Sequence, residues 1–319
     1  MGKLAHSFEF VLKPLPPYSF KLTVRKPAGW SLFTPFEIYE GGALWTAAHL
    51  NTSLFGMRLE SVGNVDECSI RARIFTDVEL EQPRQMELRR LVGISLGVDQ
   101  DLAPFYEMAI KDSILSHTIP DLYGLHDTFP IALFPEAVLA ILLQMAPLKR
   151  SNEMIASFIR NYGEVAEFDG KQVYAWPTQE RLAGVSEKEI SSKCKVGYRS
   201  KHIVKLAGRL AKGDFPTAQQ LMDMGPEEAK KLLISLPGIG DYSADIINPH
   251  GGFPIDAWSA EVFGKLFFGR EPENNREAVE KVKSEGLKRW GKWAWMAFFY
   301  IAQDLPNLSE KLGISLRLT

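Results

Sequence analysis

Apolar residues occupy every second position along much of the first quarter of the chain. Two stretches show this alternation most clearly, YSFKLTVRK (residues 18–26) and CSIRARIF (residues 68–75). A period of two predicts half-buried β-strands, and clusters of Gly, Pro and Asn separate the stretches as turns would. We therefore expect both stretches to be strands of a small antiparallel β-sheet domain over residues 1–84.

From about Gln85 to the end of the chain, apolar residues recur three and four positions apart. EAVLAILLQM, SNEMIASFIRNY, GPEEAKKLLISL and REAVEKVKSEGLKRW are examples. This spacing is typical of amphipathic helices. The sequence shows no internal repeat with a period of 20–50 residues. The sequence predicts an α+β protein in which the N-terminal sheet domain precedes an all-helical, two-lobed body over residues 85–319.

Composition excludes several classes of protein. The chain has 319 residues, of which 45% are hydrophobic and 24% charged, and its net charge is −2. The longest apolar run, AWMAFFYIA (residues 294–302), is too short to span a bilayer, and the N-terminal residues do not resemble a signal peptide. Cys68 and Cys194 are the only cysteines and cannot form a four-cysteine metal site. We expect an intracellular, cytoplasmic protein without a membrane partner.

Positive charge is concentrated in one segment, residues 193–213, which has seven basic residues and no acidic one. Four of the seven are spaced by four, four and three positions, so they would form one stripe along a helix, where like charges repel by a few tenths of a kcal/mol per pair. Either a solvated helix face or contact with a polyanion explains the stripe. The seven residues are Lys193, Lys195, Arg199, Lys201, Lys205, Arg209 and Lys212.

A glycine-containing turn joins two helical patterns in EEAKKLLISLPGIGDYSADII, at about residues 227–247. Gly238 and Gly240, on either side of Ile239, can take positive φ and leave backbone N–H groups uncovered. These groups lie at the start of a helix, where the dipole favours an anion. We expect the turn to bind a phosphate of a nucleic-acid backbone. Such a contact positions the protein on the nucleic acid but does not recognise the base sequence. An ordinary helical corner without a ligand is the alternative.

Three further stretches accompany this hairpin: FPIDAW, GYRSKHIVKLA (residues 197–207) and EAVLAILLQMAPLKRSNEMIASFIRNYG (residues 136–163). Over roughly residues 130–305 the chain resembles the helix-hairpin-helix (HhH-GPD) DNA glycosylase superfamily. The resemblance is closest to 3-methyladenine DNA glycosylase II, with 8-oxoguanine DNA glycosylase as a near relative. It implies a monomeric enzyme of base excision repair that acts on double-stranded DNA containing a damaged base.

The resemblance assigns the catalytic carboxylate to Asp256. The residues agree, because Asp256 stands where it would cap the helix AWSAEVFGKLFFG, and the helix dipole would keep it ionised. At about 4 Å and an effective dielectric of 20, it would stabilise an oxocarbenium-like sugar by about 4 kcal/mol. A purely structural cap is the alternative. The stretch between hairpin and Asp256 is shorter than the family usually shows, and NPHGG (residues 248–252) interrupts the helix.

Tyr242 bears on the type of chemistry. Relatives that also cleave the DNA strand have a lysine two residues after the second glycine, where it forms a Schiff base with the sugar. Tyr242 occupies that position here, and a phenol cannot form an imine. The resemblance therefore implies a monofunctional hydrolase, in which water attacks and an abasic site remains.

Pro147 predicts a break in the helix near Ala146, which places Gln144 and Met145 at a corner. The resemblance implies that this corner inserts a side chain into the duplex, with Met145 as the wedge; an apolar wedge suits that role. For the flipped base, the candidate pocket residues are Tyr242, Phe299 and Trp258. Aromatic rings attract a cationic alkylated base by about 0.5–2 kcal/mol, although most aromatic stripes form core.

The sequence thus predicts a monofunctional DNA N-glycosylase for alkylated purines. An 8-oxoguanine-type glycosylase and a non-catalytic helix-hairpin-helix DNA-binding protein are the alternatives. No metal-ligand cluster is apparent and no cofactor is expected, although the resemblance implies a monovalent cation at the hairpin carbonyls. The residues expected to bind DNA phosphates are Gly238, Ile239, Gly240, Lys201 and Arg199.

Overall fold

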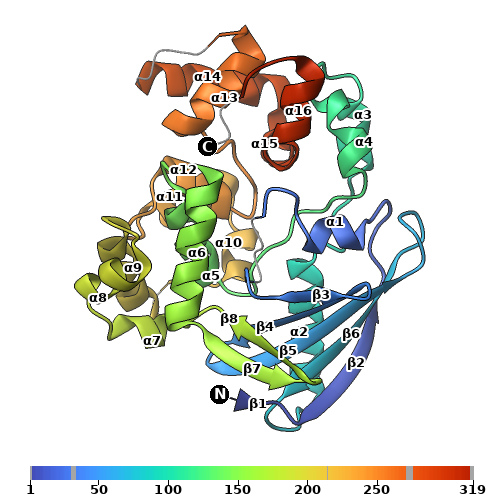
Figure 1. Ribbon diagram of the computed structural model, residues 1–319, viewed down its shortest axis with the longest axis vertical. Helices are drawn as coiled ribbons and strands as arrows, with labels where there is room; N and C mark the ends of the chain where they lie inside the picture. Colours follow the sequence, from blue (N-terminus) through green and yellow to red (C-terminus); the bar gives the residue numbers. More distant parts are fainter. Residues whose placement is uncertain (1, 30–33, 214, 271–275, 317–319) are drawn as a thin grey trace.

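A computed structural model describes residues 2–29, 34–213, 215–270 and 276–316. Its N-terminal part contains a five-stranded antiparallel sheet with the strand order β2-β6-β5-β4-β3 (Figure 1). The strands are β2 (His6–Leu12), β3 (Ile38–Glu40), β4 (Ala43–Leu50), β5 (Ser53–Val62) and β6 (Ser69–Thr76). This sheet and the helices that follow confirm the predicted α+β class.

The two alternating stretches fold differently. CSIRARIF forms β6, as predicted, with Ile70, Ala72 and Ile74 fully buried. YSFKLTVRK does not form a strand: it contains helix α1 (Phe20–Val24). The Ser19 hydroxyl caps this helix by accepting from the Leu22 N–H, and a helix buries Phe20 and Val24 on one side because they are four residues apart.

A second small sheet lies against the first. Strands β7 (Glu164–Phe168) and β8 (Lys171–Ala175) form a hairpin, and β1 (Gly2–Lys3) pairs parallel to β7. The expectation that residues 85–319 are all helical is therefore wrong. Asp169 and Gly170 both have positive φ, as the type I′ turn of a two-residue hairpin requires. The Asp-Gly pair between two alternating stretches was the signal for this hairpin.

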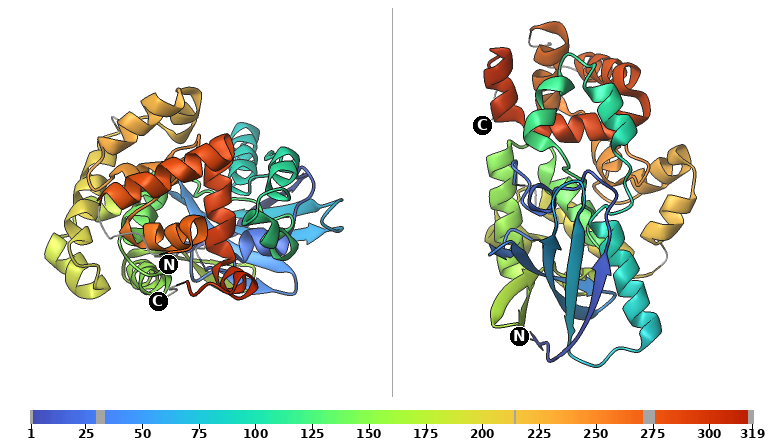
Figure 2. Two further views of the ribbon diagram at one scale, coloured as in Figure 1. Left: turned by 90° about the horizontal axis from the view of Figure 1, so that it is seen from above. Right: turned by 90° about the vertical axis from the view of Figure 1, so that its right-hand side faces the viewer.

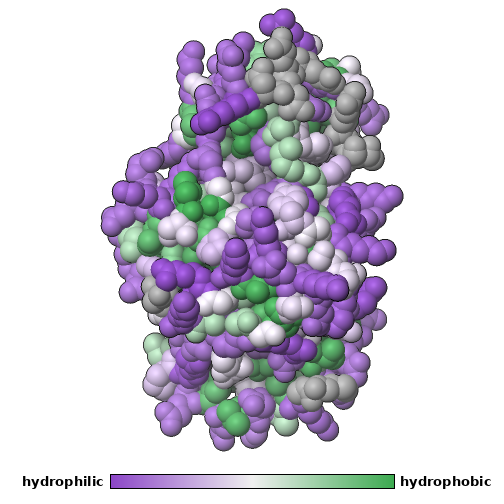
Figure 3. All heavy atoms as spheres, turned by 90° about the vertical axis from the view of Figure 1, so that its left-hand side faces the viewer, coloured by the Kyte–Doolittle hydropathy of each residue, from purple (hydrophilic) through white to green (hydrophobic). Residues whose placement is uncertain are grey.

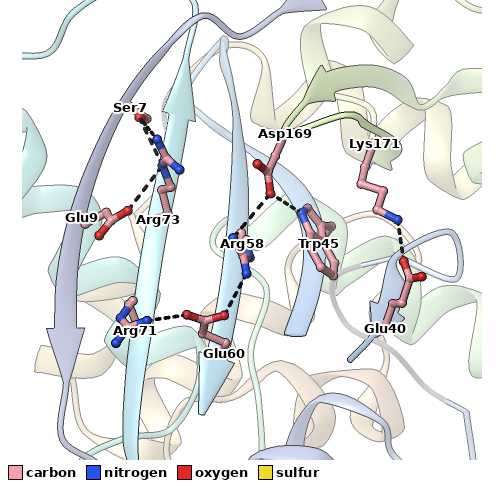
Figure 4. A network of polar contacts seen from close by, with 10 residues as sticks. All are labelled: Ser7, Glu9, Glu40, Trp45, Arg58, Glu60, Arg71, Arg73, Asp169 and Lys171. Carbon is pink, nitrogen blue, oxygen red and sulfur yellow. Dashed lines mark hydrogen bonds and ion pairs between the residues drawn. The ribbon is translucent and has the colours of Figure 1, made fainter. Parts of the chain in front are cut away.

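Helix α2 (Gln82–Ser95) contributes Leu88 and Val92 to the buried core of the five-stranded sheet. The β7–β8 hairpin is packed closely on the same sheet, since a Cβ at Gly56 would come within 2.4 Å of the Phe168 ring. Around this hairpin, arginine and lysine side chains are paired with carboxylates (Figure 4). The pairs are Arg58–Glu60, Arg71–Glu60, Arg73–Glu9 and Lys171–Glu40. These basic residues are neutralised locally, which disfavours this part of the sheet as a polyanion surface.

The helices form two lobes, each with its own buried core, as predicted (Figures 1 and 2). The central lobe contains α5 (Leu133–Leu143), α6 (Leu148–Tyr162), α7 (Gln179–Ala183), α8 (Glu187–Cys194), α9 (Arg199–Leu210), α10 (Ala218–Asp223), α11 (Pro226–Ile234) and α12 (Asp241–Ile247). The upper lobe contains α3 (Ala103–Ala109), η1 (Leu115–His117), α4 (Ile119–Leu122), α13 (Ala257–Phe268), α14 (Arg276–Trp290), η2 (Gly291–Trp293), α15 (Ala294–Gln303) and α16 (Leu305–Leu312).

Hydrophilic residues predominate on the face drawn in Figure 3, and its hydrophobic spots are small and separate. Within the described residues, no helix has the length and apolar character needed to cross a membrane. The proposed domain boundary at residues 84/85 remains a prediction.

Candidate active site

The turn between α11 and α12 forms one wall of an open groove of about 410 Å³. The corner between α5 and α6, helix α9 and the start of α13 also line the groove. Four segments of the chain therefore meet there. Its lining residues are Gln144, Met145, His202, Gly238, Ile239, Gly240, Asp241, Tyr242, Ser243 and Asp256.

The two glycines of the turn have different reasons to be there. Gly238 has φ +82°, and a Cβ on it would lie 2.6 Å from the Cβ of His202, so the fold requires glycine at this position. Gly240 has an extended backbone and no atom within 4 Å of the place its Cβ would take. The expected positive φ is thus found at Gly238 alone, while Gly240 leaves the groove wall bare.

Ile239 does not fit its expected role as a phosphate-binding residue. Its side chain is buried, and its backbone N–H donates to the carbonyl oxygen of Leu236 at 3.1 Å. The residue therefore anchors the turn in the core of the central lobe, and its N–H group is already engaged within the protein.

Asp256 caps α13, as predicted from its position. Its Oδ1 accepts from the Ser259 N–H at 2.9 Å, and its own N–H donates to the Ser259 hydroxyl at 2.8 Å. Its Oδ2 accepts a third hydrogen bond, from the Met145 N–H at 3.0 Å. The carboxylate is thereby held at the groove in a fixed orientation, with the capping role and exposure to the groove combined in one side chain.

The corner between α5 and α6 separates its two candidate wedge residues. Met145 adopts φ +47° and is 59% exposed. Gln144 is instead tied to the hairpin, because its Nε2 donates to the Gly238 carbonyl at 2.8 Å and to the Ser243 hydroxyl at 2.7 Å. Gln144 therefore connects the corner with the hairpin, and its expected role as a wedge stays a prediction.

Arg199, at the start of α9, is also placed differently from the expectation. The residue is 8% exposed, and its guanidinium donates to the carbonyl oxygens of Ile141 and Gln144. These carbonyls end α5 and lack helical partners. Arg199 thus supports the corner from inside the protein rather than facing a phosphate. Lys201, Lys205, Arg209 and Lys212 are exposed, and the first three share α9.

Tyr242 separates the groove from a second cavity of about 40 Å³, since it lines both. The cavity lies where the two helical lobes meet the N-terminal domain. Aromatic and aliphatic side chains from α5, α12 and α15 form most of its wall: Leu139, Leu143, Tyr242, Ile246, Trp295, Phe298 and Phe299. Trp258 does not line the cavity. It packs against the upper-lobe core, and its expected pocket role stays a prediction.

One side of this cavity is polar. Lys26 donates to the Thr128 hydroxyl at 2.6 Å and lies 3.8 Å from an Asp127 carboxylate oxygen. The other Asp127 oxygen accepts from the Trp295 indole at 2.7 Å. Glu136, on α5, completes the polar side. The sequence analysis missed these residues, because nothing in their spacing indicates that they come together.

Burial changes the protonation of several groups around the cavity. It lowers the pKa of Lys26 to about 8, against the attraction of Asp127 and Glu37, so the ammonium remains largely protonated at pH 7. Burial, with Asp127 nearby, raises the pKa of the Glu136 carboxyl well above its usual range. Burial and then the Asp256 carboxylate raise the pKa of the Tyr242 hydroxyl. Tyr242 is therefore a neutral phenol.

Asp241 and Asp245, the other carboxylates near the hairpin, are paired with lysines. Lys230 on α11 lies 2.7 Å from Asp241 and 2.6 Å from Asp245, and Lys283 on α14 contacts both. The cluster joins the hairpin to the upper lobe. A Cβ at Gly252 would lie 2.5 Å from the Asp245 carboxyl, which explains one glycine of NPHGG.

Histidines were assigned no role from the sequence. His202 nevertheless lines the groove beside Gly238. Burial, followed by Lys201 and Lys205, lowers its pKa, so the ring is neutral at pH 7. His250 is exposed in the loop that follows α12.

Among the described residues, no group of three or more His, Cys, Asp or Glu side chains could hold a metal ion. Two of the hairpin carbonyls already accept hydrogen bonds, that of Leu236 from Ile239 and that of Gly238 from Gln144. Each carbonyl has a second lone pair, so the monovalent cation at this turn remains a prediction.

No family model matches the chain. The chain is 25% identical over 227 residues to a DNA-3-methyladenine glycosylase of Bacillus subtilis, covering 70% of this chain and 73% of the relative. It is also 25% identical over 272 residues to a probable N-glycosylase/DNA lyase of Methanothermobacter thermautotrophicus, covering 78% and 82% respectively.

Two solved structures have the same fold. A 3-methyladenine DNA-glycosylase from Archaeoglobus fulgidus superposes with a TM-score of 0.73 at 20% identity, over 92% of this chain and 97% of that one. A Clostridium acetobutylicum 8-oxoguanine glycosylase/lyase bound to double-stranded DNA superposes with a TM-score of 0.70 at 16% identity, over 98% and 99%. These relatives and structures are of the kind that the sequence motifs indicated, and the resemblance to the helix-hairpin-helix DNA glycosylases is confirmed.

Proposed function

We propose that this chain is a monofunctional DNA N-glycosylase that hydrolyses the N-glycosidic bond of flipped-out, damaged purines, with alkylated purines as its first candidate substrates. The observation that carries the proposal is the meeting of Met145 and Asp256 in one groove, joined by a 3.0 Å hydrogen bond. An exposed apolar side chain beside a carboxylate suits an enzyme that displaces a nucleotide from the duplex and acts on its sugar.

Asp256 supplies the electrostatic part of the reaction in this proposal. As the bond between base and sugar breaks, positive charge develops on the sugar, and an ionised carboxylate stabilises it. The capping bonds from Ser259 fix the carboxylate before the substrate arrives, so little reorganisation is needed during the reaction. Water then adds to the sugar and leaves an abasic site.

Tyr242 supports a hydrolytic reaction. It stands between the groove and the aromatic-walled cavity, where a flipped base would enter with its sugar near Asp256. A neutral phenol cannot form a Schiff base with the sugar. The cavity has room for a small number of waters and is smaller than a purine, so binding a base requires its side chains to move apart.

Phosphate contacts of the groove would position the duplex. The bare surface at Gly240 and the exposed lysine stripe of α9, which includes Lys201, lie on elements next to the groove. These contacts supply affinity without base specificity. DNA that contains a damaged base is therefore the partner in this proposal.

The alkylated-purine assignment is supported by the aromatic walls of the cavity and by the name of the Bacillus subtilis relative. Excision of oxidised guanine is the second candidate. It is favoured by the polar side of the cavity, where Lys26 and Glu136 can hydrogen bond to a base edge, and by the N-glycosylase/DNA lyase relative.

Single-turnover base release tests the proposal. Duplexes carrying one damaged base each, 3-methyladenine, hypoxanthine, ethenoadenine or 8-oxoguanine, are incubated with wild type or Asp256→Asn, with and without borohydride. We expect release by wild type to fall on the order of a thousandfold in the variant, with no trapped adduct. Asp77→Asn is the control, because Asp77 is an exposed aspartate of the N-terminal domain that does not line the groove. A trapped adduct would contradict the monofunctional mechanism, and no release by wild type would leave a DNA-binding module.

A further inference from the structure

The Phe299 ring, a candidate to bind a cationic base, already contacts the cationic side chain of Lys26. The Lys26 ammonium lies 5.3 Å from the centroid of the Phe299 ring, within the range of a cation–π contact. The Trp295 ring is stacked at 6.4 Å from the same ring, with 17° between their planes. Phe299 thus has close neighbours that a cationic base would have to displace or lie beside.

Lys26 belongs to the N-terminal domain, two residues beyond α1, yet it forms part of a cavity built mainly by the helical lobes. It is 8% exposed and is held there by Thr128 and Asp127. An ammonium has three donors. Thr128 accepts from one of them, while Asp127 at 3.8 Å is an ion-pair partner beyond hydrogen-bond distance. Another donor can hydrogen bond to an acceptor atom of a base in the cavity.

We propose that Lys26 is a specificity-determining residue that makes the base pocket favour neutral damaged purines bearing an acceptor atom over cationic ones. The inference rests on the proposed function of the groove and changes the order of its candidate substrates, because it places neutral damaged purines ahead of cationic alkylated purines such as 3-methyladenine. It also gives the N-terminal domain a role in the site, because that domain delivers the only positively charged side chain among the described residues that line the cavity.

The electrostatic argument depends on the separation of like charges. A cationic base that reaches Phe299 or Tyr242 stands within a few ångströms of the Lys26 ammonium, inside a wall that excludes water and screens weakly. The carboxylates of Asp127 and Glu37, which attract the Lys26 ammonium, offset part of this repulsion. Both Asp127 oxygens, however, already accept hydrogen bonds, from Thr128 N–H and from Trp295.

Glu136 acts in the same direction. It lines the cavity from α5, and the raised pKa of its carboxyl favours the protonated form, which donates and accepts hydrogen bonds without adding a negative charge. A neutral purine with a carbonyl or ring-nitrogen acceptor therefore finds a donor in Lys26 and a second polar group in Glu136. Hypoxanthine, ethenoadenine and 8-oxoguanine have these features.

Two substitutions with different expected effects test the inference. Single-turnover release is measured for 3-methyladenine from methylated duplex and for hypoxanthine from a duplex of the same length. The quantity compared between proteins is the rate for 3-methyladenine divided by the rate for hypoxanthine, so that the inherent lability of each base cancels. Lys26→Met should raise this ratio by about tenfold, whereas Lys26→Arg, which keeps the positive charge, should leave it close to the wild-type value.

Lys21→Met is the control, since Lys21 is an exposed lysine of the same domain, and it should leave the ratio unchanged. Thermal unfolding followed by circular dichroism shows whether each variant is folded. If Lys26 had a structural role alone, both variants would release the two bases more slowly by the same factor. That result overturns the inference. So does release of 3-methyladenine but of neither hypoxanthine nor ethenoadenine by wild type. Absence of any release removes the proposed function as well.

Discussion

The Met145 N–H donates a 3.0 Å hydrogen bond to Oδ2 of Asp256 across 111 residues of sequence. The bond joins the exposed corner between α5 and α6 to the capped start of α13. Because Gln144 is tied to the hairpin through Gly238, the corner, the hairpin and the carboxylate form one connected unit. If DNA displaced the corner, the position of the Asp256 carboxylate would therefore change as well.

Met145→Ala should slow base release from fully paired duplex by on the order of tenfold. Without the exposed thioether chain, nothing would fill the space that the flipped nucleotide leaves. Stability should change little, because the side chain is 59% exposed and alanine adopts the positive φ no less readily than methionine. The measurement is single-turnover release from paired and from single-stranded substrate.

Two results would separate the wedge from a general effect of losing a methionine. Met86→Ala, a change at another exposed methionine on α2, should release base from both substrates like wild type. An equal loss of activity by Met145→Ala on paired and single-stranded DNA would contradict a role in base flipping.

The hairpin glycines should respond differently to substitution. Gly238→Ala is expected to destabilise the fold by more than 1 kcal/mol, because alanine is strained at φ +82° and its Cβ would clash with His202. Gly240→Ala should leave the unfolding midpoint unchanged but weaken duplex binding several-fold, because its methyl group covers the bare turn. Denaturant unfolding and fluorescence anisotropy measure the two properties. A loss of stability in Gly240→Ala would show that this glycine serves the fold.

Arg199 and Lys201 are two residues apart on α9 but should behave in opposite ways. Lys201→Ala should reduce the slope of log K against log salt by about 1 and leave stability unchanged, as loss of one phosphate contact would. Arg199→Met should cost about 1.5–3 kcal/mol of stability, because two helix-end carbonyls lose a charged donor. Salt titrations of DNA binding and denaturant unfolding distinguish them. Lys111→Ala, on the upper lobe, should change neither quantity.

Glu136 should make the stability depend on pH. Burial, with Asp127 nearby, raises the pKa of its carboxyl well above the usual value of 4.5. A raised pKa in the folded state stabilises the fold fully below the unfolded value, and this contribution is lost as pH rises through the folded value. Glu136→Gln should therefore unfold like wild type near pH 4 and be more stable than wild type near pH 8. Equal denaturant midpoints of the two proteins at both pH values would contradict a buried, protonated Glu136.

Much of the site could be predicted from local sequence. The hairpin, the capping position of Asp256 and the break before Pro147 each depend on a few neighbouring residues: glycine backbone freedom, a side chain that accepts from the first helical turn, and a missing N–H. β6 was predicted for a similar reason, since its alternation matches the face that it buries. These features need no partner from elsewhere in the chain.

Other predictions failed where two local readings competed. YSFKLTVRK alternates like a strand, but Phe20 and Val24 are also four residues apart, as on one face of a helix. The Ser19 side chain caps this helix and so stabilises α1. The Asp-Gly turn at residues 169–170 was a local signal that the helical pattern around it concealed. Trp258 was a candidate pocket residue, but the direction of its side chain could not be predicted from the sequence, because that direction depends on the packing of α13.

The sequence by itself determined the kinds of chemistry available here: a carboxylate at a helix start, a bare glycine turn and a phenol where an amine would be needed. Only the tertiary structure decided which charged residues face outward and which meet in the cavity. Arg199 is held inside by helix-end carbonyls, and Lys26 reaches Phe299 across 273 positions because two lobes and the N-terminal domain converge. Such contacts depend on the packing of whole elements, which no short stretch of residues specifies.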